Sequence, residues 1–293
     1  MTARVHVTEF TDPACPWAWG SEPALRWLAR VLAGRVAWRR VFGILFDEDE
    51  DPPPDPEAET RWYERFVAGV AAHTHAPYAA RLSRVSESSW PACLAARAAQ
   101  EQGPAVAERV LRRLREAALV RGVPADRPAE VRTAVAGVPG LDEERLLADL
   151  AAPRVRRAVR ADWAETRRPE PEVLHLPERG PHGGRAKELA EGYRYALPTL
   201  VFSGPGGRYV APGWRSPAEY LACAERAAGE PLPRPAPLPA AQALAHYRTL
   251  TGPELRLLTA EGEPPPGAVE FATPTGSLWL HPEEAAVHPA TAG

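Results

Sequence analysis

The residue best suited to carry out a reaction is Cys15, in the run Asp12-Pro13-Ala14-Cys15-Pro16-Trp17-Ala18-Trp19-Gly20. Residues 4–11 alternate like a strand, and the apolar residues from Pro16 to about Leu32 recur at nearly helical spacing. Cys15 is therefore predicted at a helix N-terminus. Unpaired backbone N–H groups and the helix dipole favour a thiolate there. A thiolate is the attacking group in thiol–disulfide exchange.

The other two cysteines, Cys93 and Cys223, are expected to pack in the interior. Cys93 follows Ser88-Ser89-Trp90-Pro91 at a predicted helix start, and Cys223 lies beside Leu221 and Ala222. Three cysteines in 293 residues do not form a disulfide framework. Because the first residues also lack the apolar core of a signal peptide, we expect a reducing cytoplasm.

Composition excludes several classes of function. The net charge of −3 gives no electrostatic footprint for nucleic acid or an anionic membrane, and no stretch has the length of a transmembrane helix. His73 and His75 have a spacing that can ligate a metal, but no third ligand with matching spacing lies near them, and His182 is in a remote glycine-containing loop. No metal site is predicted.

The elements around Cys15 begin an α/β fold. Residues 36–42 read as a second strand, so the first 42 residues make a βαβ unit with parallel strands. The proline-rich acidic stretch 47–56 is a loop. Helical patterns follow near residues 57–72, 91–102, 105–121, 142–151 and 154–166, and then a loop at 168–187.

Strand signals return after these helices. Residues 199–202 and 208–211 flank a glycine-rich turn, and Ser216-Pro217 opens a helix to about Ala228, with Ser216 as N-cap. Past a proline-rich linker at 230–240 come helical stretches at 240–248 and 253–259 and a hairpin at 268–271 and 277–281. We interpret this tail as a packing arm rather than a degenerate winged helix, because no third helix carries basic residues for a DNA groove.

This order resembles the DsbA-like thioredoxin-fold family, most closely its FrnE-like cytoplasmic branch. That family's run is Asp-Pro-x-Cys-x-x-Cys-Trp-Gly followed by Glu-Pro-x-Leu, and Leu197-Pro198-Thr199 fits its later strand entry. The matching residues are Asp12, Pro13, Cys15, Trp19, Gly20, Glu22, Pro23 and Leu25, whereas Ala18 replaces the second cysteine. The resemblance covers roughly residues 4–229.

The resemblance implies an α/β, thioredoxin-like fold with an all-helical insertion. The thioredoxin-like domain would be discontinuous, made of residues 1–46 and 188–229. Residues 47–187 would form the helical insertion with its flanking loops, and residues 230–293 the linker and a small C-terminal extension.

The resemblance also implies a site. The Leu197–Pro198 bond is expected to be cis and to face Cys15, so that the backbone edge of Leu197 can pair with an extended peptide or a thiol-bearing ligand. Cys15 and Pro198 would be catalytic. Pro16, Trp17, Leu197 and Thr199 would bind substrate, with Trp17 exposed. No tightly bound cofactor is implied, although a low-molecular-weight thiol is a candidate co-substrate.

Ala18 leaves three functions open, since it cannot resolve a mixed disulfide. In the first and favoured one, Cys15 is the thiolate of a monothiol oxidoreductase that acts on a thiol- or disulfide-bearing protein or small molecule. An external thiol, or Cys93, would then release the partner from its mixed disulfide with Cys15. The second is a redox-inactive adaptor, as in relatives that deliver a regulator to the ClpXP protease. The third is a glutathione-dependent isomerase or transferase of the kappa type, which usually has serine at the position of Cys15.

Overall fold

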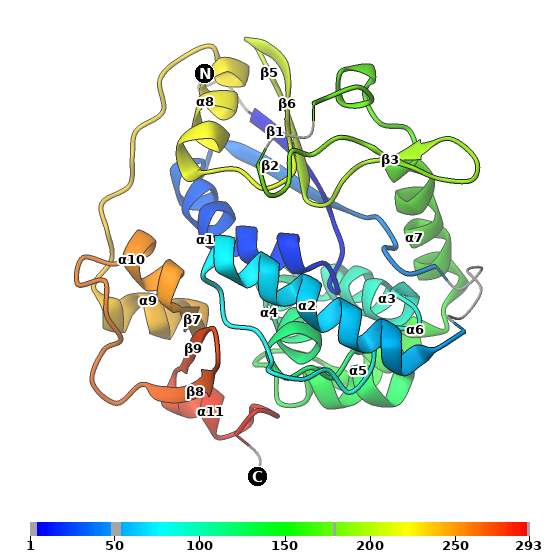
Figure 1. The fold of residues 1–293 in the computed structure, drawn as a ribbon. Helices are drawn as coiled ribbons and strands as arrows, with labels where there is room; N and C mark the ends of the chain where they lie inside the picture. The colour runs from blue at the N-terminus through cyan, green and yellow to red at the C-terminus, as the bar shows by residue number, and fades with distance from the viewer. Residues whose placement is uncertain (1–4, 48–53, 178–179, 292–293) are drawn as a thin grey trace.

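A four-stranded sheet carries the thiol site. The computed structural model describes residues 5–47, 54–177 and 180–291. The sheet has the order β2-β1-β5-β6 and is built from β1 (Val5–Thr11), β2 (Val36–Phe42), β5 (Thr199–Gly204) and β6 (Gly207–Pro212). As expected, β1 and β2 are parallel, whereas β5 runs antiparallel to β1 with Thr199 opposite Phe10. The last residues of β1 and the first residues of β5 therefore lie side by side at the same end of the sheet (Figure 1).

Two helices pack against one face of this sheet. They are α1 (Pro16–Val31) and α8 (Pro217–Ala228). Leu28 and Tyr220 of these helices form an apolar cluster with Val7 and Phe202 of the strands. Ser216 caps α8 as predicted, since its hydroxyl accepts the Glu219 N–H and the Glu219 carboxylate accepts the Ser216 N–H.

The insertion is helical, and its later helices share a core of their own, whereas its first helix packs against α1. It contains α2 (Pro56–Thr74), α3 (Trp90–Ala99), α4 (Pro104–Arg115), α5 (Pro128–Val135), α6 (Glu143–Leu150) and α7 (Pro153–Thr166). A 3₁₀ turn (Gln100–Gln102) follows α3, and a π turn (Glu116–Val120) extends α4. The shared core includes Cys93, Leu114 and Leu146.

Helix α5 is not predicted by the sequence pattern. Its Pro128 looks like a break between helices, but in the structure it occupies the first helical turn, where a missing N–H costs nothing. The predicted loop at 47–56 is largely outside the described residues, as is Arg4 of the first predicted strand. The later loop, 168–187, contains a 3₁₀ turn (Pro171–Val173) and leads into a short ribbon of β3 (Lys187–Glu188) and β4 (Tyr193–Arg194).

The C-terminal extension is more structured than the expected arm. It contains α9 (Ala240–Tyr247), β7 (Thr249–Thr251), α10 (Gly252–Leu258), β8 (Val269–Thr273), β9 (Gly276–Leu280) and α11 (Pro282–Ala285). The unpredicted β7 pairs with β9, so the predicted hairpin becomes a three-stranded sheet. No helix lies between α10 and β8, a span that the structure describes in full.

Buried ion pairs join this extension to α4. The guanidinium of Arg112 donates to both oxygens of Glu254 at 3.0 Å, and Arg113 donates to Glu284 at 2.8 Å. Of the helices described, none is both long enough and apolar enough to cross a membrane.

Candidate thiol site

Cys15 lies at the N-terminus of α1, as predicted. It is the extended N-cap residue, with φ −80° and ψ 116°, and Pro16 occupies the first helical position. The first helical hydrogen bond runs from the Trp19 N–H to the Cys15 carbonyl, at 3.1 Å. Proline suits this position because its nitrogen would have had no helical partner.

Asp12 holds the loop that precedes the cysteine. One carboxyl oxygen accepts the Ala14 N–H at 2.7 Å, and the other accepts the Leu45 N–H at 2.8 Å. The second oxygen also accepts a hydrogen bond from the Cys93 thiol, at 3.7 Å. Burial raises the pKa of Asp12. The sequence shows Asp12 only as a match to the active-site run of the family. The structure shows that its hydrogen bonds join the ends of β1 and β2 to α3.

The Cys15 thiol is buried, and this overturns the expectation of a thiolate. Cys15 is 3% exposed, and its Sγ donates to the Leu197 carbonyl at 3.4 Å. Burial raises the pKa of Cys15 to about 11, and the nearby Asp12 adds to the rise. The N–H groups of Ala18 and Trp17 lower the pKa, as a helix N-terminus should, but desolvation is the larger effect. The thiol is therefore neutral at pH 7.

The Leu197–Pro198 peptide is cis, and the carbonyl groups of both residues accept hydrogen bonds from within the chain. The Leu197 carbonyl accepts from both Cys15 Sγ and His182 Nε2, the latter at 2.9 Å, and Gly213 N–H donates to the Pro198 carbonyl at 2.8 Å. Thr199 is buried, and its hydroxyl donates to the Ala196 carbonyl at 2.6 Å. The side chain of Thr199 is thus committed to its own turn and is not presented to a ligand.

Trp17 and His182 cover the thiol region. The expectation that Trp17 is exposed is wrong, since it is 7% exposed and its indole stacks on the His182 imidazole, with ring centroids 4.9 Å apart. The rings of His73 and Trp214 lie 6.2 Å from the indole. The stacking partner comes from the loop before β3, which local sequence pattern does not relate to α1.

His182 is neutral at pH 7. Burial lowers the pKa of His182 to about 4, and the cations Lys187, Arg215 and Arg194 add to this effect. Because the Leu197 carbonyl can only accept, Nε2 carries the proton. The sequence offered one signal for this arrangement, the glycines that follow His182. Gly184 has φ +81°, and a Cβ there would lie 2.3 Å from the Pro212 carbonyl carbon, so glycine lets the loop approach β6.

The structure therefore brings together the residues expected in the site, and Cys93 packs in the interior, as expected. Pro16 is buried beside Cys15, and its carbonyl accepts from the Tyr78 hydroxyl at 2.8 Å. Cys93 is buried in the helical core, where burial first and the adjacent Asp12 second raise the pKa of its thiol. All three cysteines are free. Within the described ranges, no three His, Cys, Asp or Glu side chains are grouped to hold a metal.

The amino-acid sequence is similar to that of a known family and of one curated protein. The sequence profile of the family described as thioredoxin matches residues 9–173. Over 167 residues the chain is 30% identical to the ClpXP adapter protein SpxH of Shouchella clausii, a match covering 55% of this chain and 53% of that protein. The chain thus spans about half the length of the curated relative that it matches.

Solved structures share the fold. A putative protein disulfide isomerase from Nitrosomonas europaea has a TM-score of 0.55 at 14% identity, covering 75% of this chain and 95% of that one. A probable DsbA oxidoreductase from Streptomyces coelicolor has a TM-score of 0.52 at 19% identity (80% and 94%). The cytosolic disulfide reductase DsbM of Pseudomonas aeruginosa has a TM-score of 0.51 at 18% identity (76% and 95%). At these identities the likeness concerns the fold alone.

Proposed function

This chain belongs to the thioredoxin family, with the DsbA-like fold, and from that premise we propose that it is a binding protein of the adaptor type that has kept the fold without a redox cycle. The observation that carries the proposal is the state of the Leu197 carbonyl. Cys15 and His182 both donate to it, so the acceptor on the backbone edge beside Pro198 is already hydrogen-bonded within the chain.

The state of the thiol supports the same proposal. A thiol with a pKa of about 11 is about 100-fold less ionised at pH 7 than one at the ordinary value of 9.0. Ala18 supplies no second sulfur, and Cys93 is bonded to Asp12 in the core. A mixed disulfide at Cys15 would therefore form slowly and would have no internal thiol to release it.

A partner class is suggested by the curated relative. Because that protein is named as a ClpXP adapter, we propose that this chain binds a ClpXP-type protease or its client in the cytoplasm. The proposal needs no cofactor, metal or nucleic acid.

The first experiment measures thiol reactivity. In a Cys223→Ser background, which removes the partly exposed third cysteine, iodoacetamide labelling of the Cys15 peptide is followed by mass spectrometry from pH 6 to 10. We expect Cys15 in the folded protein to react about 100-fold more slowly at pH 7 than in the urea-unfolded protein. A folded rate equal to or above the unfolded rate would overturn the proposal.

A second experiment tests binding itself. The purified protein, its Cys15→Ser variant and a Cys93→Ser control are titrated against ClpXP from the same organism, alone and with a candidate client. We expect all three to bind with the same Kd within about twofold, because one core thiol contributes little to surface binding. Loss of binding in Cys15→Ser alone, or no binding by the native protein, would contradict an adaptor that works without redox chemistry.

One specific feature favours the monothiol oxidoreductase as a second candidate. The N–H groups of Trp17 and Ala18 still act on Cys15, and the cis-Pro198 segment still faces it. If Trp17 and His182 moved aside, exchange with a low-molecular-weight thiol or a substrate disulfide would follow the usual route. Labelling of Cys15 at neutral pH would support this candidate. No observation favours the glutathione-dependent kappa-type reaction, and we do not propose it.

A further inference from the structure

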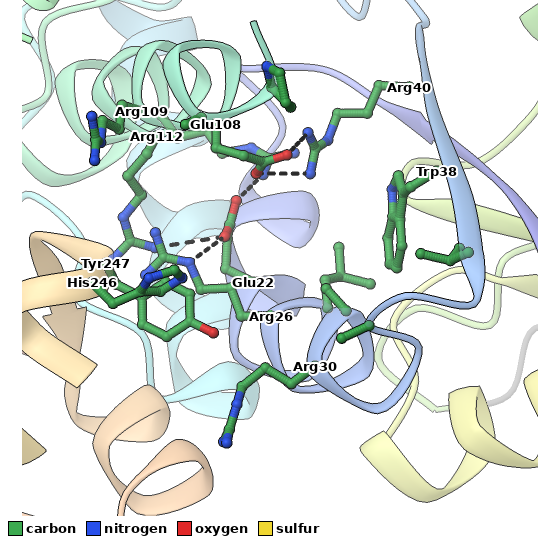
Figure 2. Close-up of a pocket in the computed structure, with 17 residues that line it drawn as sticks. Glu22, Arg26, Arg30, Trp38, Arg40, Glu108, Arg109, Arg112, His246 and Tyr247 are labelled. Atoms are coloured by element: carbon green, nitrogen blue, oxygen red, sulfur yellow. Dashed lines mark hydrogen bonds and ion pairs between the residues drawn. The ribbon is translucent and has the colours of Figure 1, made fainter. Parts of the chain in front are cut away.

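A cavity lies away from the thiol site. It measures about 480 Å³ and is bounded by α1, the edge strand β2, α4 and α9 (Figure 2). This volume is within the range of about 300–1,000 Å³ that small-molecule sites occupy. None of the thiol-site residues lines it, so an inference about this cavity does not depend on the proposed function.

The walls of the cavity combine apolar and aromatic side chains. Leu25 and Ala29 of α1 form one side together with Val36 of β2. In Figure 2, Trp38 and Tyr247 lie on opposite sides of the opening. The Trp38 indole is held in place, because its N–H donates to Glu9 at 2.8 Å. Two rings facing one space suit a flat apolar body.

Charge in the cavity is unevenly balanced. Four of its arginines are bonded to carboxylates, namely Arg26, Arg40, Arg112 and Arg115. Arg30 and Arg109 differ from these. Arg30 donates to the Ala236 carbonyl at 2.7 Å and to the Leu258 carbonyl at 3.5 Å, and Arg109 donates to the Pro139 carbonyl at 3.0 Å. Among the described residues neither forms an ion pair with a carboxylate, unlike the other four arginines. Their positive charge is therefore available to a ligand.

One further observation points to an acid group. Burial lowers the pKa of His246, and Arg26, Arg109 and Arg30 lower it further, so positive charge is concentrated at this wall.

We propose that this cavity binds a small organic anion with a flat apolar body, the body between Trp38 and Tyr247 and the acid group beside His246, where Arg30 and Arg109 concentrate positive charge. The C-terminal extension then has a role in binding, since Tyr247 and His246 complete a cavity that α1, β2 and α4 leave open on one side.

A matched pair of probes tests the charge requirement. The anion 8-anilino-1-naphthalenesulfonate and the uncharged N-phenyl-1-naphthylamine have similar aromatic bodies, and both fluoresce when bound to apolar sites. We expect saturable, one-to-one binding of the anion, at least about tenfold tighter than the neutral probe, because tenfold corresponds to about 1.4 kcal/mol, close to what a hydrogen bond to a charged group contributes. Equal affinity for both probes, or no saturable binding of the anion, would overturn the proposal.

Variants locate the site. Arg30→Gln and Arg109→Gln each remove one charge but keep a side-chain donor, and we expect each to weaken binding of the anion about three- to tenfold with little effect on the neutral probe. Two controls should leave binding unchanged. Arg132→Gln removes a charge from the surface of α5, and Phe66→Ser removes part of the exposed apolar surface on α2. If Phe66→Ser abolishes binding and the arginine variants do not, the probe binds on α2 and the proposal fails.

The imidazole of His246 gives a readout that does not depend on the probe's fluorescence. Its NMR resonance, assigned with a His246→Gln variant, is titrated with and without saturating anion. A bound acid group beside the ring should raise the pKa of His246, because it offsets the neighbouring arginines. An unchanged pKa at saturation would place the anion elsewhere and contradict the proposal.

Discussion

The Trp17 indole and the His182 imidazole stack at an interplanar angle of 10°, and His182 shares the Leu197 carbonyl with the Cys15 thiol. A residue of the first helix and a residue of a loop more than 160 positions later thus close the thiol site together. Both rings are neutral at pH 7, so the cover is held by packing and one hydrogen bond rather than by ion pairs.

Removing His182 should open the site. In His182→Ala the stacking partner of Trp17 and one donor to Leu197 are lost, so water reaches Cys15 and its pKa falls from about 11 toward the ordinary value. Because each pKa unit changes the thiolate fraction about tenfold, we expect Cys15 to be alkylated at least about tenfold faster at pH 8. The control is His73→Ala, whose ring is 6.2 Å from the indole and exposed. Equal rates in the two variants would show that His182 is not the cover.

Gly20 is required where α1 meets α2. A Cβ at Gly20 would lie 2.3 Å from Cγ2 of Thr74, so Gly20→Ala should lower the free energy of unfolding by about 1–3 kcal/mol. Urea denaturation followed by tryptophan fluorescence measures this change. Thr74→Ser removes the nearest atom and should restore part of the loss. Gly69→Ala on α2, whose Cβ would have no neighbour within 4 Å, should instead be neutral or slightly stabilising. A Gly20→Ala protein as stable as the native one would refute the close approach.

Glu254 anchors the C-terminal extension. Its carboxylate accepts from Arg112 at 3.0 Å and pairs with Arg26 at 2.9 Å, and Glu254 is fully buried. Glu254→Gln leaves these guanidinium groups short of a counter-charge, so we expect a loss of about 3 kcal/mol or more and faster proteolysis in the linker near residues 230–239. Glu230→Gln removes a partly exposed pair with Arg35 and should cost less than about 1 kcal/mol. Similar losses in the two variants would argue against the anchor.

Asp162 should make the protein more stable as the solution is mildly acidified. Burial raises the pKa of Asp162 to about 6, above its ordinary value of 3.8. Between these values the folded state holds a proton on Asp162 that the unfolded state releases, so this group contributes stability that grows as pH falls from 7 to about 4. Asp162→Asn should remove that part of the pH dependence and raise stability at pH 7. The free energy of unfolding is measured from pH 7 to 4.5 for both proteins. Parallel curves for native and variant protein would contradict the raised pKa.

The local sequence pattern was sufficient to predict most of the helices and strands. The predicted strand at 36–42 is β2, and the helix opened by Ser216 and Pro217 is α8, because strand alternation, an N-cap hydroxyl and a proline at the first helical position are short-range signals. The same rule placed Cys15 at the start of α1. It misled at Pro128, since a proline that begins a helix looks the same in sequence as one that ends a helix.

The sequence by itself determined the order of the main-sheet strands β1, β2, β5 and β6 with helices α1 and α8, the position of Cys15 and the loss of the second sulfur at Ala18. Only the tertiary structure decided the state of that thiol, because its pKa depends on what desolvates it, and the covering His182 comes from a loop far along the chain. The same holds for the arginine-lined cavity, whose walls come from α1, β2, α4 and α9. Short-range periodicity indicates the secondary structure of a segment. Burial and the local electric field depend instead on residues from distant segments that come into contact only in the folded protein.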